Sequence, residues 1–215
     1  MNSNYGRELR SYNFELRSGH DEKHGDLITG TPIVFGRRTE LMGWDEMIAP
    51  GALDKTDLRD VRFLVNHDTS MIPLARSRNN NENSTMQMTV EEDGLHIRVD
   101  LDTEGNAEAR SLYSAVSRGD ISGMSFMFRV DSDEWEDLDS ERPLRTITGI
   151  SKVFEVSAVT WPAYEQTSIE ARSSAKELES SASVLESARK AKADREARQA
   201  LINDTLRRLE EAKHA

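Results

Sequence analysis

The clearest hydrophobic pattern in the chain is an alternation over residues 118–130, which read Arg-Gly-Asp-Ile-Ser-Gly-Met-Ser-Phe-Met-Phe-Arg-Val. With a period of two, the large apolar side chains share one face of a strand, and small or polar side chains share the other. The apolar row consists of Met124, Phe126, Phe128 and Val130. Ser125 falls on the opposite face and can point into a cleft, whereas Ser122 falls on the apolar face, where we expect a buried hydroxyl. An ordinary strand serine fits the same pattern, so this stretch alone gives Ser125 no role.

Shorter alternating or apolar runs on both sides of that stretch predict further strands. Residues 86–90 and 95–101 flank an acidic turn and are predicted to form a hairpin. Asn106 is placed to cap a helix over residues 107–118. The remaining predicted strands are residues 27–35, 61–66, 146–153 and 154–159, with an acidic loop at residues 131–141. Many short strands around one clear helix indicate a β-rich α+β fold, with a barrel or sandwich rather than a βαβ layout.

The composition changes sharply after Arg172. Beyond it there is no Gly, Pro or aromatic residue, and Ala, Ser, Glu, Lys and Arg dominate. Residues 172–215 carry ten Lys/Arg and eight Asp/Glu, a net charge of +2, so residues 1–171 carry −13 against a chain total of −11. We therefore expect three parts: a polar leader at residues 1–24 that frays, a folded domain at residues 25–172, and a Ser-rich linker with a charged helical tail at residues 173–215.

The composition also limits the class of protein. A net charge of −11 speaks against nucleic acid as the main partner, and no apolar run is long enough to cross a membrane. The first ten residues lack the apolar centre of a signal peptide, which fits an intracellular protein. The sequence contains no cysteine. We expect neither a cofactor nor a metal, because there is no phosphate-binding glycine loop, and because His20 and His24 lack the surrounding carboxylate pattern of a known metal site.

A serine nucleophile needs a base to take its proton, and this base is usually a histidine. The chain has five histidines. His67 directly follows the apolar run at residues 61–66 and begins a loop, a common place for a functional residue on a rigid scaffold. A strand-end histidine with a purely structural role fits the same position. The other four lie in expected tails or on a polar strand face: His20, His24, His96 and His214.

A third group usually orients the histidine, and Glu155 is the best placed acid. It interrupts the apolar run Val-Phe-Glu-Val-Ser-Ala-Val-Thr, where it shares a strand face with Ser157. A carboxylate in such a strand is costly unless it has a partner. That partner can be an imidazole, or equally a lysine or arginine. Asp68 is a weaker choice, because its side chain diverges from that of its neighbour His67.

Three segments of the chain together resemble blocks of the tailed-phage prohead serine proteases. They are Phe63-Leu-Val-Asn-His-Asp68, Arg118-Gly-Asp-Ile-Ser-Gly-Met-Ser-Phe126 and Phe154-Glu-Val-Ser-Ala-Val-Thr-Trp-Pro-Ala-Tyr164. They occur in the family's order between Gly25 and Arg172. The Ile48-Ala-Pro-Gly-Ala52 turn and the Glu92-Asp-Gly-Leu95 hairpin are also similar. The chain departs from the family at Met127, often a small residue there, and at Ala158, often a proline.

The resemblance implies a capsid-maturation serine endopeptidase with a compact β-barrel flanked by helices, distantly similar to the herpesvirus assemblins. It places the nucleophile at Ser125 and the base at His67, and we choose Glu155 as the acid. The implied substrates are the N-terminal segment of the major capsid protein, any scaffold and the protease itself, inside the assembling prohead in the host cytoplasm. Self-association stays open. The alternative is a non-catalytic assembly or scaffolding module that binds the coat protein.

The tail supports that alternative, because helix formers dominate it from Val184 onward. Leu201 and Leu209 share a helix face, with Ile202 and Leu206 beside it, but the stretch before them is too polar for a strong coiled coil. A solvated helix with weak self-association fits this pattern equally well. Our hypothesis is that the tail docks on scaffold or coat protein and is then removed by self-cleavage.

Overall fold

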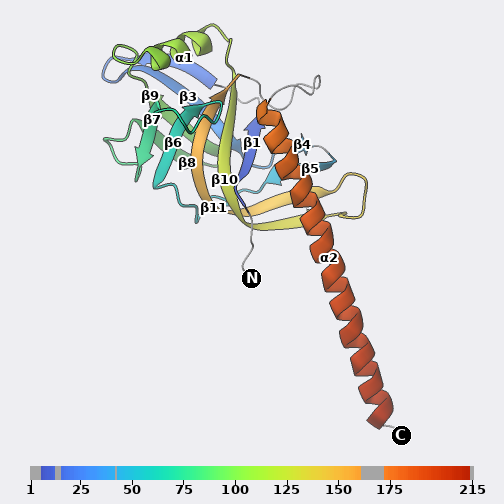
Figure 1. Cartoon of the computed structure of the whole chain (residues 1–215). Coiled ribbons are helices and arrows are strands. Elements are labelled where there is room, and N and C mark those ends of the chain that lie inside the picture. The colour runs from blue at the N-terminus through green and yellow to red at the C-terminus, as the bar shows by residue number, and fades with distance from the viewer. Residues whose placement is uncertain (1–5, 13–15, 42, 161–171, 214–215) are drawn as a thin grey trace.

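A computed structural model describes residues 6–12, 16–41, 43–160 and 172–213 of the chain (Figure 1). Their strands form two sheets, with a short helix at one end and a long C-terminal helix that projects from the body. The elements are β1 (Glu8–Tyr12), β2 (Leu16–Asp21), β3 (Gly25–Val34), β4 (Thr39–Leu41), β5 (Trp44–Ile48), β6 (Asp60–Val65), β7 (Ala75–Arg78), β8 (Met86–Glu91), β9 (Gly94–Asp100), α1 (Ala107–Ser117), β10 (Gly123–Glu136), β11 (Leu144–Val159) and α2 (Arg172–Lys213). The β-rich α+β class predicted from the sequence is confirmed, whereas the described strands make two sheets and no closed barrel.

The larger sheet has seven strands and is built around the long strand β11. Its order is β1-β10-β11-β5-β4, and β6 and β7 extend it beside the end of β11. Because β11 has 16 residues, it pairs in parallel with β5 near its start and with β6 near its end. The smaller sheet has the order β2-β3-β9-β8. β1 is therefore an edge strand whose partner is β10.

The two sheets share one hydrophobic core. The predicted apolar row of β10 is buried and packs in one cluster with side chains of the smaller sheet, including Ile28 and Ile33 of β3. Burying a side chain of this size contributes on the order of 1.5–3 kcal/mol. The opposite face of β10, which carries Ser125, is consequently free for polar chemistry.

Several local predictions are confirmed. β8 and β9 form the expected hairpin. α1 begins after Asn106, whose side-chain oxygen accepts hydrogen bonds from the N–H groups of Glu108 at 2.9 Å and Ala109 at 3.3 Å. These bonds satisfy two of the four amide groups that a helix start leaves unpaired.

Other predictions are wrong. The N-terminal leader was expected to fray, but it contributes β1 and β2. The acidic loop at residues 131–141 is largely strand, because β10 continues to Glu136, and residues 144–159 form one strand instead of two. In β1 and in the second half of β10, buried charged side chains have ion-pair partners on other strands, which hydrophobic patterning does not reveal. Ser122 is exposed, because it lies just before the first residue of β10.

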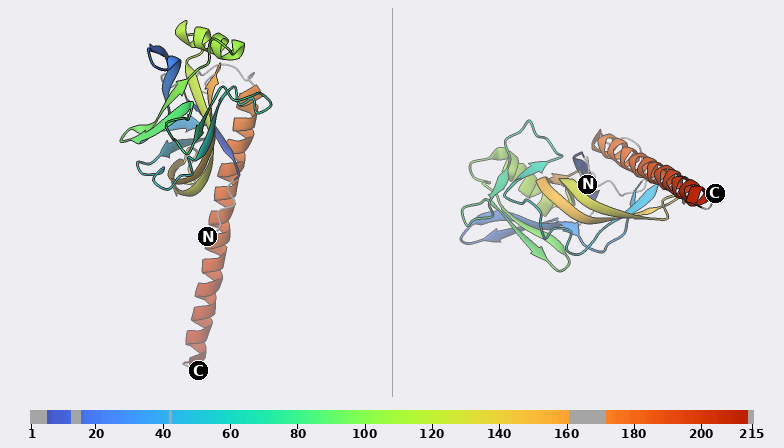
Figure 2. Two further views of the ribbon diagram at one scale, coloured as in Figure 1. Left: turned by 90° about the vertical axis from the view of Figure 1, so that its left-hand side faces the viewer. Right: turned by 90° about the horizontal axis from the view of Figure 1, so that it is seen from below.

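α2 is described from Arg172 onward, and the Ser-rich residues predicted to form a linker belong to this helix. It lies beside β1 near its start and then extends away from the body (Figures 1 and 2). Arg189 donates to the carbonyl groups of Leu138 at 3.2 Å and Ser140 at 3.1 Å, which anchors α2 to the β10–β11 connection. Within the described ranges, neither helix combines the length and the apolar composition needed to span a membrane.

Candidate active site

His67 sits on a tight turn that immediately follows β6. Asn66 and His67 both adopt left-handed backbone conformations, with φ of 51° and 58°. Such a conformation costs a non-glycine residue on the order of 1–3 kcal/mol, so the surroundings must hold it. The Asn66 N–H donates to the carbonyl of Ala158 at 2.9 Å, and the His67 N–H donates to Ser157 Oγ at 3.2 Å. The Asn66 side chain also accepts from the Thr160 N–H at 3.0 Å. The turn is thus fixed to the end of β11.

The side chain of Glu155 orients the His67 imidazole. Glu155 Oε1 lies 2.5 Å from His67 Nδ1, and the Ser157 hydroxyl donates to Glu155 Oε2 at 2.6 Å. The Glu155 and His67 side chains are only 3% and 9% exposed. Because the carboxylate occupies Nδ1, we assign the ring proton of a neutral imidazole to that atom, which leaves Nε2 as the basic nitrogen. Nε2 is buried without a hydrogen-bond partner among the described residues.

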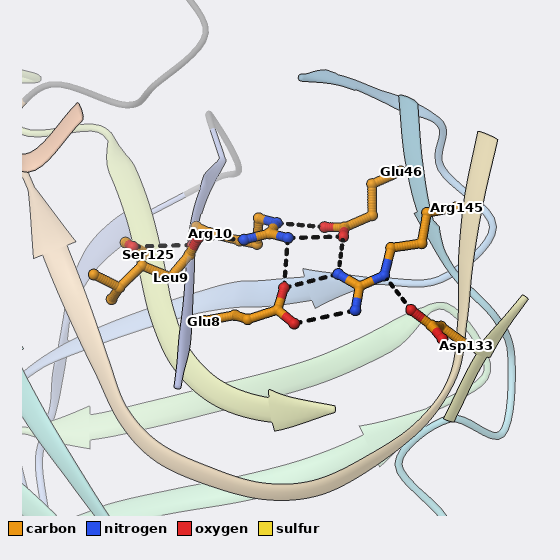
Figure 3. A network of polar contacts seen from close by, with 7 residues as sticks. All are labelled: Glu8, Leu9, Arg10, Glu46, Ser125, Asp133 and Arg145. Carbon is orange, nitrogen blue, oxygen red and sulfur yellow. Dashed lines mark hydrogen bonds and ion pairs between the residues drawn. The ribbon is translucent and has the colours of Figure 1, made fainter. Parts of the chain in front are cut away.

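Ser125 lies on the same face of the sheet as this pair. In β10 it stands directly opposite Ser157 of β11, and two residues later Met127 stands opposite Glu155. Directly opposite residues of antiparallel strands project from the same face. Ser125 is fully buried, and its hydroxyl donates to the carbonyl of Arg10 in β1 at 2.9 Å (Figure 3). The structure therefore brings the three predicted residues to one face, with the Ser125 hydroxyl held by β1.

Two contributors to this region were not predicted. Ser157 holds both Glu155 and the His67 main chain, and the only signal in the sequence was its position two residues after Glu155 on the same strand face. The contact with Arg10 had no signal, because β1 was assigned to the leader.

Three other histidines lie within the described residues and have other contacts, whereas His214 lies outside the described residues. His20 and His24, considered above as metal ligands, contact two different carboxylates. At the β8–β9 hairpin, Glu91, Asp93 and His96 bring ligand atoms within 4.8 Å of one another. This cluster is largely exposed, and His96 Nε2 already lies 2.7 Å from Asp93, an arrangement that holds the hairpin without a metal.

Comparisons with known proteins identify the family of this chain. A family model described as caudovirus prohead serine protease matches residues 12–181. The prohead protease of Enterobacteria phage HK97 is 30% identical over 168 residues, covering 77% of this chain and 68% of that protein. Among solved structures, the capsid assembly protease of bacteriophage T4 matches with a TM-score of 0.38 and 14% identity, covering 72% of this chain and 99% of that one. The family match and the relative show that this chain belongs to the caudovirus prohead serine proteases.

Proposed function

We propose that this protein cleaves capsid precursor proteins during prohead maturation, with Ser125 as the nucleophile, His67 as the general base and Glu155 as the residue that orients the base. Family membership makes the chain a serine peptidase of capsid maturation. The observation that carries the residue assignment is the arrangement Ser157–Glu155–His67, which leaves Nε2 of a buried imidazole open on the face that carries Ser125.

The mechanism follows from these positions. When substrate is bound, the Ser125 hydroxyl attacks the scissile carbonyl and His67 Nε2 takes its proton. His67 then gives the proton to the leaving amine, and water repeats the sequence to release the acyl group. The Glu155 carboxylate stabilises the imidazolium that forms in each step. Main-chain N–H groups that bind the developing oxyanion would supply on the order of 3 kcal/mol each.

The substrates that we propose are the N-terminal segment of the major capsid protein, any scaffold and the protease itself. The family model describes caudovirus prohead serine proteases and the phage HK97 relative is named a prohead protease, which supports this choice. The site of action is then the assembling prohead in the host cytoplasm. The distant likeness to the assemblins is part of the same proposal.

Co-expression with the coat protein tests the assignment. Ser125→Ala and His67→Ala should each abolish coat-protein processing while the circular dichroism spectrum stays that of the wild type. Ser122→Ala is the matched control, since that serine lies three residues away and is exposed. Processing by Ser125→Ala at the wild-type rate, or its loss in Ser122→Ala, would show that the nucleophile is assigned wrongly.

An assembly function of the tail is a second candidate and is compatible with the first. The projecting half of α2 exposes four apolar side chains: Leu201, Ile202, Leu206 and Leu209 are 44–67% exposed. We propose that this stripe docks on scaffold or coat protein during assembly, and that self-cleavage later removes the tail. Normal incorporation into particles of a chain ending at Arg172 would contradict the docking. A stable full-length chain in maturing particles would contradict the self-cleavage.

A further inference from the structure

The arrangement around Ser125 cannot accept a substrate as it stands. The side chain of Ser125 has no exposed surface, and its hydroxyl donates its hydrogen bond to the Arg10 carbonyl (Figure 3). The β10 edge beside it is fully used, because β1 pairs with it from Glu8 opposite Phe128 to Tyr12 opposite Met124. A peptide that must reach Ser125 as an extended strand meets β1 already in that place.

β1 is held at the edge of the sheet by main-chain hydrogen bonds and ion pairs. None of its described side chains belongs to the hydrophobic core. Instead, Glu8 and Arg10, both 2% exposed, point to the core side of the sheet and enter a network of buried charges. Leu9 and Ser11 alternate with them on the face that carries Ser125.

Three residues of the body form the seat for these charges, which we call the charge cradle: Glu46 of β5, Arg145 of β11 and Asp133 of β10 (Figure 3). Arg10 Nε lies 2.5 Å from Glu46, and Arg145 Nη1 lies 2.8 Å from Glu8. Arg145 also donates to Asp133 at 2.6 Å and to Glu46 at 3.1 Å. The cradle therefore receives an acidic side chain and, two residues later, a basic one.

The buried charge of Glu8 is compensated within this network. Burial by itself would raise the pKa of Glu8, but the guanidinium groups of Arg10 and Arg145 lower it below its ordinary value. Charged groups recover their hydration when they leave a buried site, whereas apolar side chains do not. A strand that is held at a sheet edge by main-chain hydrogen bonds and ion pairs can thus be exchanged for another strand of the same pattern.

We propose that β1 occupies the substrate-binding edge of β10 as an internal pseudosubstrate, and that it must leave before an extended peptide with an acidic-x-basic segment can bind in the charge cradle and reach Ser125. This rests on the proposed role of Ser125 as the nucleophile. In the bound peptide, the basic residue takes the place of Arg10, the residue whose carbonyl now contacts the Ser125 hydroxyl. α2 lies beside β1 and backs the closed arrangement.

A reversible covalent lock tests the release of β1 in the full chain. Leu9 and Met127 stand directly opposite each other in β1 and β10, and both are partly exposed. The natural chain has no cysteine, so Leu9→Cys with Met127→Cys creates a single defined disulfide. The readout is the rate at which a fluorophosphonate probe labels Ser125. We expect the oxidised protein to be labelled at least tenfold more slowly than the same protein after reduction.

The possible outcomes distinguish a failure of this inference from a failure of the proposed function. Equal labelling in the oxidised and reduced proteins overturns the pseudosubstrate role and leaves Ser125 as the nucleophile. Labelling of neither protein, together with an unlabelled wild type after coat-protein co-expression, overturns the assignment of Ser125 instead. The single-cysteine variants control for the side-chain changes.

A charge exchange tests the cradle independently of the disulfide. Glu8→Arg combined with Arg10→Glu keeps the net charge but places like charges against Arg145 and Glu46. We expect at least tenfold faster labelling of Ser125, because β1 is expelled. Unchanged labelling overturns the proposal, and so does global unfolding, because a strand that leaves cannot be essential to the fold.

Reporter substrates test the specificity. An unstructured reporter containing Glu-Leu-Arg-Ser, the sequence of residues 8–11, is compared with one containing Arg-Leu-Glu-Ser. The charge-exchanged enzyme, whose edge is open, should cleave the first reporter at least tenfold faster. Equal cleavage of the two reporters would show that the charge cradle does not select the substrate.

Discussion

Replacing Glu155 by glutamine separates its chemical role from its structural one. The glutamine has nearly the same shape and keeps an acceptor oxygen for His67 Nδ1, now 2.5 Å from the carboxylate. It removes the negative charge that faces the imidazolium in the transition state. Unit charges about 4 Å apart attract by about 4 kcal/mol at an effective dielectric constant of about 20. Since about 1.4 kcal/mol changes a rate tenfold, we expect catalysis to fall by up to roughly a thousandfold.

The stability of the Glu155→Gln protein should change far less. The two hydrogen bonds from His67 and Ser157 lose their charge assistance, which costs about 1 kcal/mol each. The cost of burying a carboxylate disappears at the same time. We therefore expect the free energy of unfolding to stay within about 2 kcal/mol of the wild-type value.

The assay is the second-order rate constant of fluorophosphonate labelling, with stability measured by urea unfolding. Labelling is followed at probe concentrations where the rate is proportional to the probe, so that the opening of β1 does not limit it. Glu92→Gln, in the exposed tip of the β8–β9 hairpin, is the matched control. A Glu155→Gln rate within threefold of the wild type would remove Glu155 from the mechanism and leave a Ser–His dyad or another acid. The loss should also be smaller than that caused by Ser125→Ala or His67→Ala.

Three further predictions concern the contacts around the site. Ser157→Ala removes a hydrogen bond to Glu155 and leaves the His67 N–H without its acceptor, so the protein should lose about 1–3 kcal/mol of stability in urea unfolding, and labelling should slow at least tenfold. Arg145→Ala removes one of the two guanidinium partners of Glu8 and of Glu46, and should cost about 3–5 kcal/mol in the same measurement. The pKa of Glu8 is lowered when β1 is docked, so docking is favoured at pH values above the ordinary pKa of a glutamate, about 4.3, and weakens as the pH falls below that value. Hydrogen exchange of residues 8–12, corrected for its intrinsic pH dependence, should therefore increase at these low pH values.

Each of these predictions has a result that contradicts it. If the Ser157→Ala protein is labelled at the wild-type rate, the His67 turn keeps its conformation without the hydrogen bonds of Ser157. A loss below 1 kcal/mol in Arg145→Ala would mean that water reaches the network. The acid effect should disappear in Glu8→Gln; if it persists, the titration of Glu8 does not control the docking of β1.

The sequence by itself determined those features that depend on local pattern. The alternation in β10 predicted which side chains enter the core, because a strand's side chains must alternate between its faces. The Asn106 cap and the β8–β9 hairpin follow from short-range hydrogen bonding and turn chemistry in the same way. Glu155 stood out because a carboxylate in an apolar strand needs a partner, and the structure supplies the imidazole of His67.

The tertiary structure decided what depends on pairing between distant segments. The partner of Glu155 was open until the parallel pairing of β6 with β11 placed the Asn66–His67 turn over it. The polar N-terminal segment had no pattern that predicts a strand, because its inward side chains are charges. Glu8 and Arg10 become compatible with burial only where β5, β10 and β11 bring together Glu46, Asp133 and Arg145. That long-range neutralisation also places β1 against Ser125.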